Sequence, residues 1–161
     1  FPEPDLLMVP LRAVVENHSA VEDKYYFSNR AVRGLKKANK AFNKGRAQNL
    51  DAPCNTVSTH LAKVSLNGTD PVLLVKTNLY RRFTPREAAR VQSFPDNFEF
   101  VGADGKKYVQ IGNAIPPVMM WHIANAVMRQ IFNDRHIFKK KEERNNVAYS
   151  IQKYAVGELV S

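Results

Sequence analysis

The chain has 161 residues, 44% of them apolar, which is enough for one domain with a real core, or a small domain with an appended segment, and excludes disorder throughout. Its 24 Lys and Arg residues outnumber 15 Asp and Glu residues, and the formal charge of +9 favours a polyanionic partner, first of all nucleic acid, over an acidic small molecule. The single cysteine, Cys54, excludes an internal disulfide or a CxxC site, which fits a reducing cytoplasm. No apolar stretch approaches the ~20 residues of a membrane-spanning helix.

The first predicted element is a short helix that begins at Pro10 and ends near His18. Leu11 and Val14 supply its apolar side, and a proline in the first turn removes no helical hydrogen bond. The residues before it, 1–4, have an extended pattern and no initiating methionine. We interpret this start as a cut, a processed end or an undetected N-terminus.

The second predicted element is a strongly basic helix from Ser28 or Asn29 to about Asn43. Residues 24–50 include eight Lys or Arg residues and no acid. Ser28 or Asn29 can cap the helix, and Gly45 marks its end. Its basic side chains would face either phosphate or water. In the second case the basic run is a solvated helix face, and the excess of positive charge serves solubility alone.

The stretch from residue 51 to residue 77 changes to a β-like pattern. Strands are predicted at residues 56–57, 61–66 and 72–75. Asn-Gly at residues 67–68 lies between two apolar runs, which is a good signal for a hairpin turn.

Helical order returns at Thr84, which can act as an N-cap. Pro85 suits the first helical position, and Glu87 can reach back to complete a capping box. This helix should end near Ser93, since Phe-Pro-Asp follows.

The last predicted helix begins at residues 116–117. The i, i+3, i+4 spacing of a half-buried helix is carried by Trp121, Ala124, Val127, Met128 and Ile131. The charged run 139–144 and the polar residues after it indicate a peripheral tail.

Two stretches are more specific than these patterns. Residues 81–96, Arg-Arg-Phe-Thr-Pro-Arg-Glu-Ala-Ala-Arg-Val-Gln-Ser-Phe-Pro-Asp, resemble motif IX of the cytosine-5 DNA methyltransferases. Residues 108–117, Tyr-Val-Gln-Ile-Gly-Asn-Ala-Ile-Pro-Pro, resemble motif X, a turn that opens the C-terminal helix in that family. Residues 23–28 with the basic helix, and residues 51–57, are similar to the target-recognition region of its bacterial branch. The resemblance covers roughly residues 1–132.

Two dipeptides imitate the family's catalytic motifs. Pro53-Cys54 resembles the nucleophile loop, and Glu16-Asn17 resembles the pair that holds the catalytic acid, but they occur in the reverse of the family's order and outside its sequence context. We therefore predict that neither is catalytic, and we interpret Cys54 as a small semi-buried residue. The family's Phe-x-Gly-x-Gly cofactor loop and Gln-x-Arg-x-Arg strand do not occur in the sequence.

The resemblance implies a reaction that this chain serves without performing it. In such enzymes the target cytosine leaves the base stack, a cysteine attacks C6, a glutamate acts at N3, and C5 takes the methyl group of S-adenosylmethionine. Thr56 would contact a phosphate beside the flipped nucleotide, with an ordinary strand threonine as the alternative. Gly112, Asn113 and Ala114 would touch the methionine end of S-adenosylmethionine, Gly112 by allowing close backbone approach. The alternative for this turn is a helix start capped by Asn113.

The other expected site residues fall into three groups. Phosphate clamps that give salt-sensitive affinity are expected at Arg30, Arg33, Lys36, Lys37 and Lys40. Base-reading side chains are expected around Ser58, His60, Lys63 and Asn67, without a choice among them. Glu87 and Arg90 are expected to brace the base of the recognition region rather than to contact DNA. No metal site is expected.

The expected fold is α+β, a small mixed recognition domain whose flanking helices complete a Rossmann-like methyltransferase domain. The expected parts are a linker or helix after the catalytic domain (1–18), the target-recognition domain (19–80), the motif IX and X helices that complete the catalytic domain (81–136), and a tail (137–161). The expected partners are double-stranded DNA and a catalytic chain or segment, with no membrane.

Three hypotheses remain open from the sequence. The chain is a natural subunit of a split methyltransferase, a piece of a single-chain enzyme, or a basic DNA-binding module without enzymatic role. In each of them we expect the chain alone to be inactive, because it contains no predicted catalytic residue.

Overall fold

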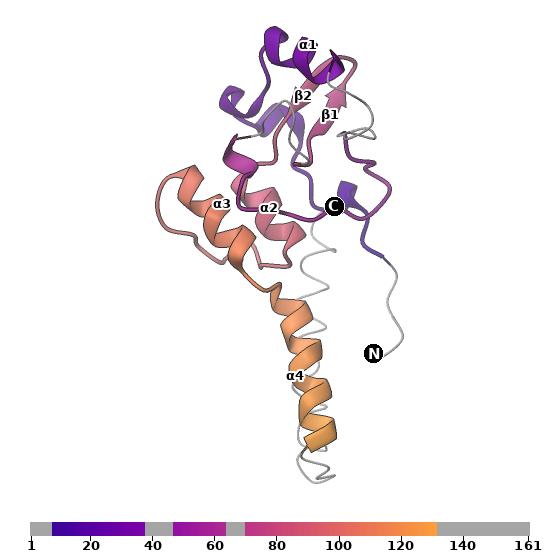
Figure 1. Cartoon of the computed structure of the whole chain (residues 1–161), viewed down its shortest axis with the longest axis vertical. Helices are drawn as coiled ribbons and strands as arrows, with labels where there is room; N and C mark the ends of the chain where they lie inside the picture. Colours follow the sequence, from indigo (N-terminus) through magenta and orange to yellow (C-terminus); the bar gives the residue numbers. More distant parts are fainter. Residues whose placement is uncertain (1–7, 38–46, 64–69, 132–161) are drawn as a thin grey trace. The chain divides into compact units, whose positions relative to one another are not determined.

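The computed structural model describes residues 8–37, 47–63 and 70–131 (Figure 1). Lys40, the Asn-Gly pair at residues 67–68 and the predicted tail lie outside these ranges. The chain divides into two compact units, Phe1–Gln92 with Phe100–Ala114, and Ser93–Glu99 with Ile115–Ser161.

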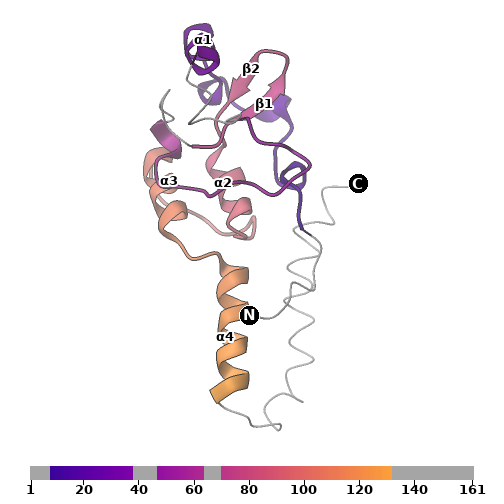
Figure 2. The same ribbon diagram turned by 45° about the vertical axis from the view of Figure 1, so that its right-hand side comes forward.

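The first unit combines short helices with one small sheet, as the α+β prediction required. Its described elements are the 3₁₀ turns η1 (Leu11–Ala13), η2 (His18–Ala20), η3 (Asp23–Tyr25) and η4 (Leu61–Lys63), the strands β1 (Leu73–Lys76) and β2 (Leu79–Arg81), and the helices α1 (Asn29–Lys37), α2 (Pro85–Val91) and α3 (Asp104–Asn113). In both ribbon views α1 lies beside the hairpin, and α2 and α3 lie against each other below it (Figures 1 and 2).

The predicted helix at residues 10–18 is wrong. The structure has two separate 3₁₀ turns there, η1 and η2. The physical reason is that the Glu16 N–H, which a helix would pair with the Arg12 carbonyl, donates to the Glu87 carboxylate at 2.8 Å, and the Val14 carbonyl accepts from Arg90 at 3.5 Å. This segment therefore bonds side chains of a distant part of the chain and does not continue as a helix.

The strand predictions are partly confirmed. The strand predicted at residues 72–75 forms β1, which pairs antiparallel with β2, with Leu73 opposite Arg81 and Leu74 opposite Tyr80. The tight turn between them contains Asn78 at φ 64°, a left-handed conformation that asparagine tolerates better than most residues.

The other two predicted strands are wrong in their described residues. Residues 56–57 have no regular structure. Leu61–Lys63 is the 3₁₀ turn η4, closed by the Lys63 N–H on the His60 carbonyl at 2.8 Å, with Leu61 fully buried. A single tight turn is enough to place the Leu61 side chain in the core, so the segment does not need to pair with a neighbouring strand.

Helix α2 forms as its sequence predicts. Thr84 is the N-cap, Pro85 opens the helix, and the reciprocal capping box between Thr84 and Glu87 is complete. The small residues Ala88 and Ala89 are fully buried, which lets α3 pack closely against this helix. Across the junction, the Tyr108 hydroxyl of α3 donates to the Phe83 carbonyl at 2.5 Å.

The second unit contains the loop Ser93–Glu99 and helix α4 (Pro117–Ile131), which begins where the sequence predicts. The Ser93 hydroxyl accepts from the Val118 N–H at 3.1 Å and so satisfies one donor in the first turn of α4. In the chain alone Trp121 and Val127 of this helix are exposed by 41% and 44%, and its predicted half-burial against a catalytic domain stays a prediction. Within the described ranges, no helix is long and apolar enough to cross a membrane.

Candidate functional site

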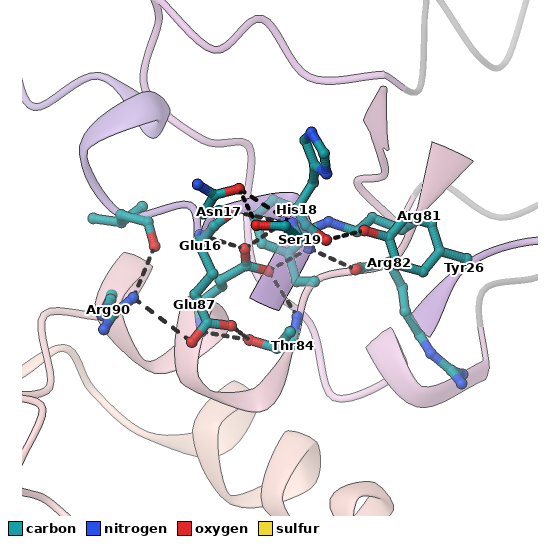
Figure 3. A network of polar contacts seen from close by, with 12 residues as sticks. Glu16, Asn17, His18, Ser19, Tyr26, Arg81, Arg82, Thr84, Glu87 and Arg90 are labelled. Carbon is teal, nitrogen blue, oxygen red and sulfur yellow. Dashed lines mark hydrogen bonds and ion pairs between the residues drawn. The ribbon is translucent and has the colours of Figure 1, made fainter. Parts of the chain in front are cut away.

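A buried ion pair joins the hairpin to helix α2. The Arg81 guanidinium at the end of β2 donates twice to the Glu87 carboxylate, at 2.7 and 2.6 Å, and both side chains have 0% exposure (Figure 3). The same carboxylate accepts from the backbone N–H groups of Glu16 and Thr84, each at 2.8 Å. The Glu87 carboxylate thus bonds three segments of the chain: the end of β2 through Arg81, the N-terminal segment through Glu16, and the start of α2 through Thr84.

Two further contacts bring the N-terminal segment onto the start of α2. The Thr84 hydroxyl accepts from the Glu87 N–H at 3.1 Å and donates to Oε2 of Glu16 at 2.7 Å. Arg90 lies 3.9 Å from Oε1 of Glu16 and donates to the Val14 carbonyl at 3.5 Å. This is where the structure places the two residues expected to brace the recognition region, Glu87 and Arg90.

The two arginines that meet this network, Arg81 and Arg82, were not predicted as site residues. Arg81 is the partner of Glu87, and Arg82 donates to the carbonyls of Ala62 (2.8 Å) and Lys24 (2.6 Å). Arg82 also lies 5.7 Å from the centre of the Tyr25 ring, a cation–π distance. The only sequence signal was a pair of arginines at the end of an apolar strand, directly before a capping box.

A second polar cluster joins η3 to the start of α3. The Tyr25 hydroxyl donates to Oδ2 of Asp104 at 2.7 Å, and the Lys24 ammonium lies 3.2 Å from the same oxygen. The hydrogen bond from Tyr25, followed by the nearby Lys24 charge, lowers the pKa of Asp104. Burial, with the hydrogen bond to Asp104, raises the pKa of Tyr25 to about 12. Both groups therefore keep their hydrogen-bonded forms at neutral pH.

The segment expected to meet DNA is an irregular chain before η4. Thr56 and His60 are exposed on it, and Lys63 is exposed at the end of η4. The Ser58 hydroxyl instead donates to Oδ1 of Asp70 at 2.7 Å and accepts from the His60 N–H at 3.1 Å. Because Ser58 is engaged within the chain, its geometry favours holding the segment over reading a base, while Thr56, His60 and Lys63 stay predictions.

Helix α1 presents the expected basic surface. Its exposed cations in the described range are Arg30, Arg33, Lys36 and Lys37. Val32 is buried and anchors the helix, and the Ser28 hydroxyl accepts from the Ala31 N–H at 3.4 Å at its start. Lys36 also donates to the side chain of Asn78 at the tip of the hairpin. The helix therefore projects its charges from a fixed position beside β1 and β2.

The motif X residues differ in local structure from the sequence prediction. Gly112 and Asn113 are the last two residues of α3, and Ala114 is its C-cap, with its N–H on the Ile111 carbonyl at 3.2 Å. The alternative of a helix start capped by Asn113 is wrong, because α4 begins only at Pro117. Asn113 is exposed at the end of α3.

Neither imitation of a catalytic motif has the surroundings of a reactive site. Burial raises the pKa of the half-buried Cys54 thiol to about 11, so the thiolate that would be needed for nucleophilic attack is disfavoured. Glu16 is bonded to Thr84, and Asn17 caps η2 by accepting from the Ser19 N–H at 3.1 Å. Among the described residues, no group of three or more His, Cys, Asp or Glu side chains is placed to hold a metal ion.

Comparison with known proteins gives a family match over most of the chain. Residues 9–129 match the family model for C-5 cytosine-specific DNA methylases. The chain is 44% identical over 87 residues to the type II methyltransferase M.AplI of Arthrospira platensis, covering 52% of this chain and 24% of that protein. It is 40% identical over 82 residues to M.Bpa9945I of Bacillus paralicheniformis, covering 51% of this chain and 17% of that protein.

A longer match is weaker in identity. The type II methyltransferase M.Sau96I of Staphylococcus aureus is 34% identical over 108 residues, covering 67% of this chain and 22% of that protein. The chain thus spans a quarter or less of the length of these relatives. No solved structure matches the chain.

Proposed function

Because this chain belongs to the C-5 cytosine-specific DNA methylase family, we propose that it is the DNA-recognition and cofactor-pocket-completing part of a DNA (cytosine-5)-methyltransferase. One observation carries the proposal: the family match extends over residues 9–129 and includes both the motif IX and the motif X stretches. The whole enzyme transfers a methyl group to C5 of a cytosine in a specific duplex sequence. Its catalytic cysteine and glutamate lie on a further segment or another chain, so this chain alone is inactive.

Recognition of DNA falls to residues 19–80. The cations of α1 attract the phosphate backbone, and Thr56, exposed on the irregular segment, bonds a phosphate beside the flipped nucleotide. His60 and Lys63 follow on the same segment and face solvent, where base edges can be reached. The buried Arg81–Glu87 pair supports this assignment, because it fixes the base of the hairpin to α2 without offering either charge to DNA.

The end of α3 fits a part of the cofactor site. S-adenosylmethionine supplies the methyl group when it is bound. Its methionine end carries an ammonium and a carboxylate group, and the partial negative charge at the carbonyl end of a ten-residue helix favours the ammonium. Asn113 adds an exposed amide there beside the small Ala114, while the space that Gly112 leaves free is filled by the Ser58–Thr59 peptide.

Helix α4 is proposed to pack on the catalytic part, which completes the Rossmann-like domain. One side of the helix carries Met119, Ile123 and Val127 at i, i+4 and i+8, and all three are exposed by 41% or more. Met120 lies beside them at 48% exposure. An exposed apolar stripe of this kind marks an interaction surface.

The experiment that tests the function is transfer of labelled methyl from S-adenosylmethionine to duplex DNA. We expect no transfer with the purified chain alone and transfer once the catalytic part with its Pro-Cys loop is added. Transfer by the chain alone would contradict the division of roles. If neither sample transfers methyl groups but salt-sensitive DNA binding is retained, the result favours the non-catalytic DNA-binding module.

A second prediction concerns the charges of α1. Replacing Arg30 and Arg33 together by Gln should weaken binding to all duplexes alike and lower the slope of log K against log salt by about 2, since each phosphate contact contributes roughly 0.9. Fluorescence anisotropy on a labelled duplex between low and moderate salt measures this slope. Arg12→Gln is the matched control, because Arg12 is an exposed arginine already paired with Asp51 at 2.7 Å. An unchanged slope in the double variant would remove α1 from the DNA interface.

A further inference from the structure

Gly112 lies at a close contact between α3 and the segment that precedes η4. A Cβ atom at this position would come within 2.6 Å of the Ser58 carbonyl carbon and of the Thr59 nitrogen, and within 2.8 Å of the Ser58 oxygen. All three are backbone atoms, which cannot turn aside as the end of a side chain can. Only glycine allows the last turn of α3 to lie directly on the Ser58–Thr59 peptide.

Both sides of this contact are held in place. On the segment side, the Ser58 hydroxyl bonds Asp70 and the His60 N–H, and Leu61 is fully buried in η4, which packs on α3. On the helix side, the Gln92 side chain donates to the Ile111 carbonyl at 3.1 Å. A shift of the end of α3 is therefore transmitted to the peptide it touches and is not absorbed by loose neighbours.

The contact joins two functions that the family resemblance treats separately. Thr56 stands two residues before Ser58, and Asn113 and Ala114 follow Gly112 directly. Resting on the proposed function, in which Thr56 bonds a DNA phosphate and residues 112–114 hold the cofactor, we propose that Gly112 is a positioning residue that couples DNA binding to cofactor binding. Because such coupling is reciprocal, each ligand favours the other by the same factor.

The test measures the coupling in the complete methyltransferase, this chain together with its catalytic part. The dissociation constant for a target duplex is determined by fluorescence anisotropy with and without saturating S-adenosylhomocysteine, the unreactive product form of the cofactor. For the unaltered enzyme we expect the ratio of the two constants to fall in the range of about 5–150 that is usual for coupled sites. Gly112→Ala should bring the ratio close to one and weaken DNA binding even without cofactor.

A matched control separates this effect from that of adding a methyl group to α3. Gly105 lies in the same helix, and a Cβ atom there meets nothing within 4 Å, so Gly105→Ala should keep the unaltered ratio. Since Gly112→Ala can also impair folding, Ser58→Ala provides a second variant, which removes both hydroxyl bonds of the segment without placing an atom against the helix. We expect it to lower the ratio to an intermediate value.

The outcomes distinguish the coupling from the function on which it rests. If the unaltered enzyme methylates DNA but both Gly112→Ala and Ser58→Ala keep its ratio, or if that ratio is one, the coupling is wrong and the function stands. If the unaltered enzyme neither methylates nor binds DNA, the function fails and the coupling fails with it. A ratio that falls in both variants and not in Gly105→Ala supports the coupling.

Discussion

Replacing Glu87 by Ala should destabilise the first unit by about 3–5 kcal/mol, because the change leaves the Arg81 charge buried without its partner. It also removes the acceptor for the backbone N–H groups of Glu16 and Thr84. A domain is typically stable by only about 5–15 kcal/mol, so we expect a large loss of the folded fraction. Urea unfolding followed by circular dichroism measures the change.

Two comparisons make this prediction specific. Glu22→Ala removes a carboxylate of the same kind from the exposed pair with Lys24, where we expect little or no loss of stability. Glu87→Leu combined with Arg81→Met should recover part of the loss, because no buried charge remains, although two backbone donors stay unpaired. Equal midpoints for Glu87→Ala and Glu22→Ala would show that the buried network contributes no stability.

Local signals predicted α2 and the start of α1 correctly. The Thr-Pro-x-Glu order at residues 84–87 contains the whole capping box, which forms in the structure as predicted. The start of α1 depends on residues next to it in sequence, with Ser28 accepting from Ala31. In both helices the signal that the sequence carries is a side-chain cap beside the first turn.

Elements that depend on distant partners could not be predicted in this way. The segment at residues 10–18 has an apolar helical pattern, but its Glu16 N–H is taken by the Glu87 carboxylate, 71 residues away. Helix α3 contains two glycines and was expected as a turn, yet burial of Tyr108 and Ile111 on one side stabilises it as a helix. In both cases tertiary contacts outweigh the local preference.

The residues of the candidate site also divide into those that the sequence predicted and those that depend on distant contacts. The family resemblance pointed to Gly112 as a place of close backbone approach, and the structure shows that its near neighbour within the chain is the Ser58–Thr59 peptide. A glycine in a sequence indicates that space is needed but not which atoms need it. Likewise, Glu87 was expected to have a structural role, while its partner Arg81 was found only through the geometry of β2 and α2.

The apolar side of α4 gives the other large expected effect. Changing Ile123 and Val127 to Lys should weaken association with the catalytic part by at least about 10-fold, because these side chains are 41% and 44% exposed and burying the exposed part of both is worth about 1.3–2.5 kcal/mol. Methyl transfer measured near the dissociation constant of the two parts should fall by the same factor. The stability of the first unit should not change, since α4 belongs to the second.

The control for α4 adds one lysine elsewhere on the helix. His122 is exposed and lies one position from Ile123, so it points about 100° away around the helix axis. His122→Lys should therefore leave association and methyl transfer close to those of the unaltered chain. If Ile123→Lys with Val127→Lys behaves like His122→Lys, the apolar side of α4 does not contact the catalytic part, and the pocket must be completed through the first unit alone. If only the double variant loses activity, and regains it when the catalytic part is added in excess, the defect lies in assembly and the site itself is intact.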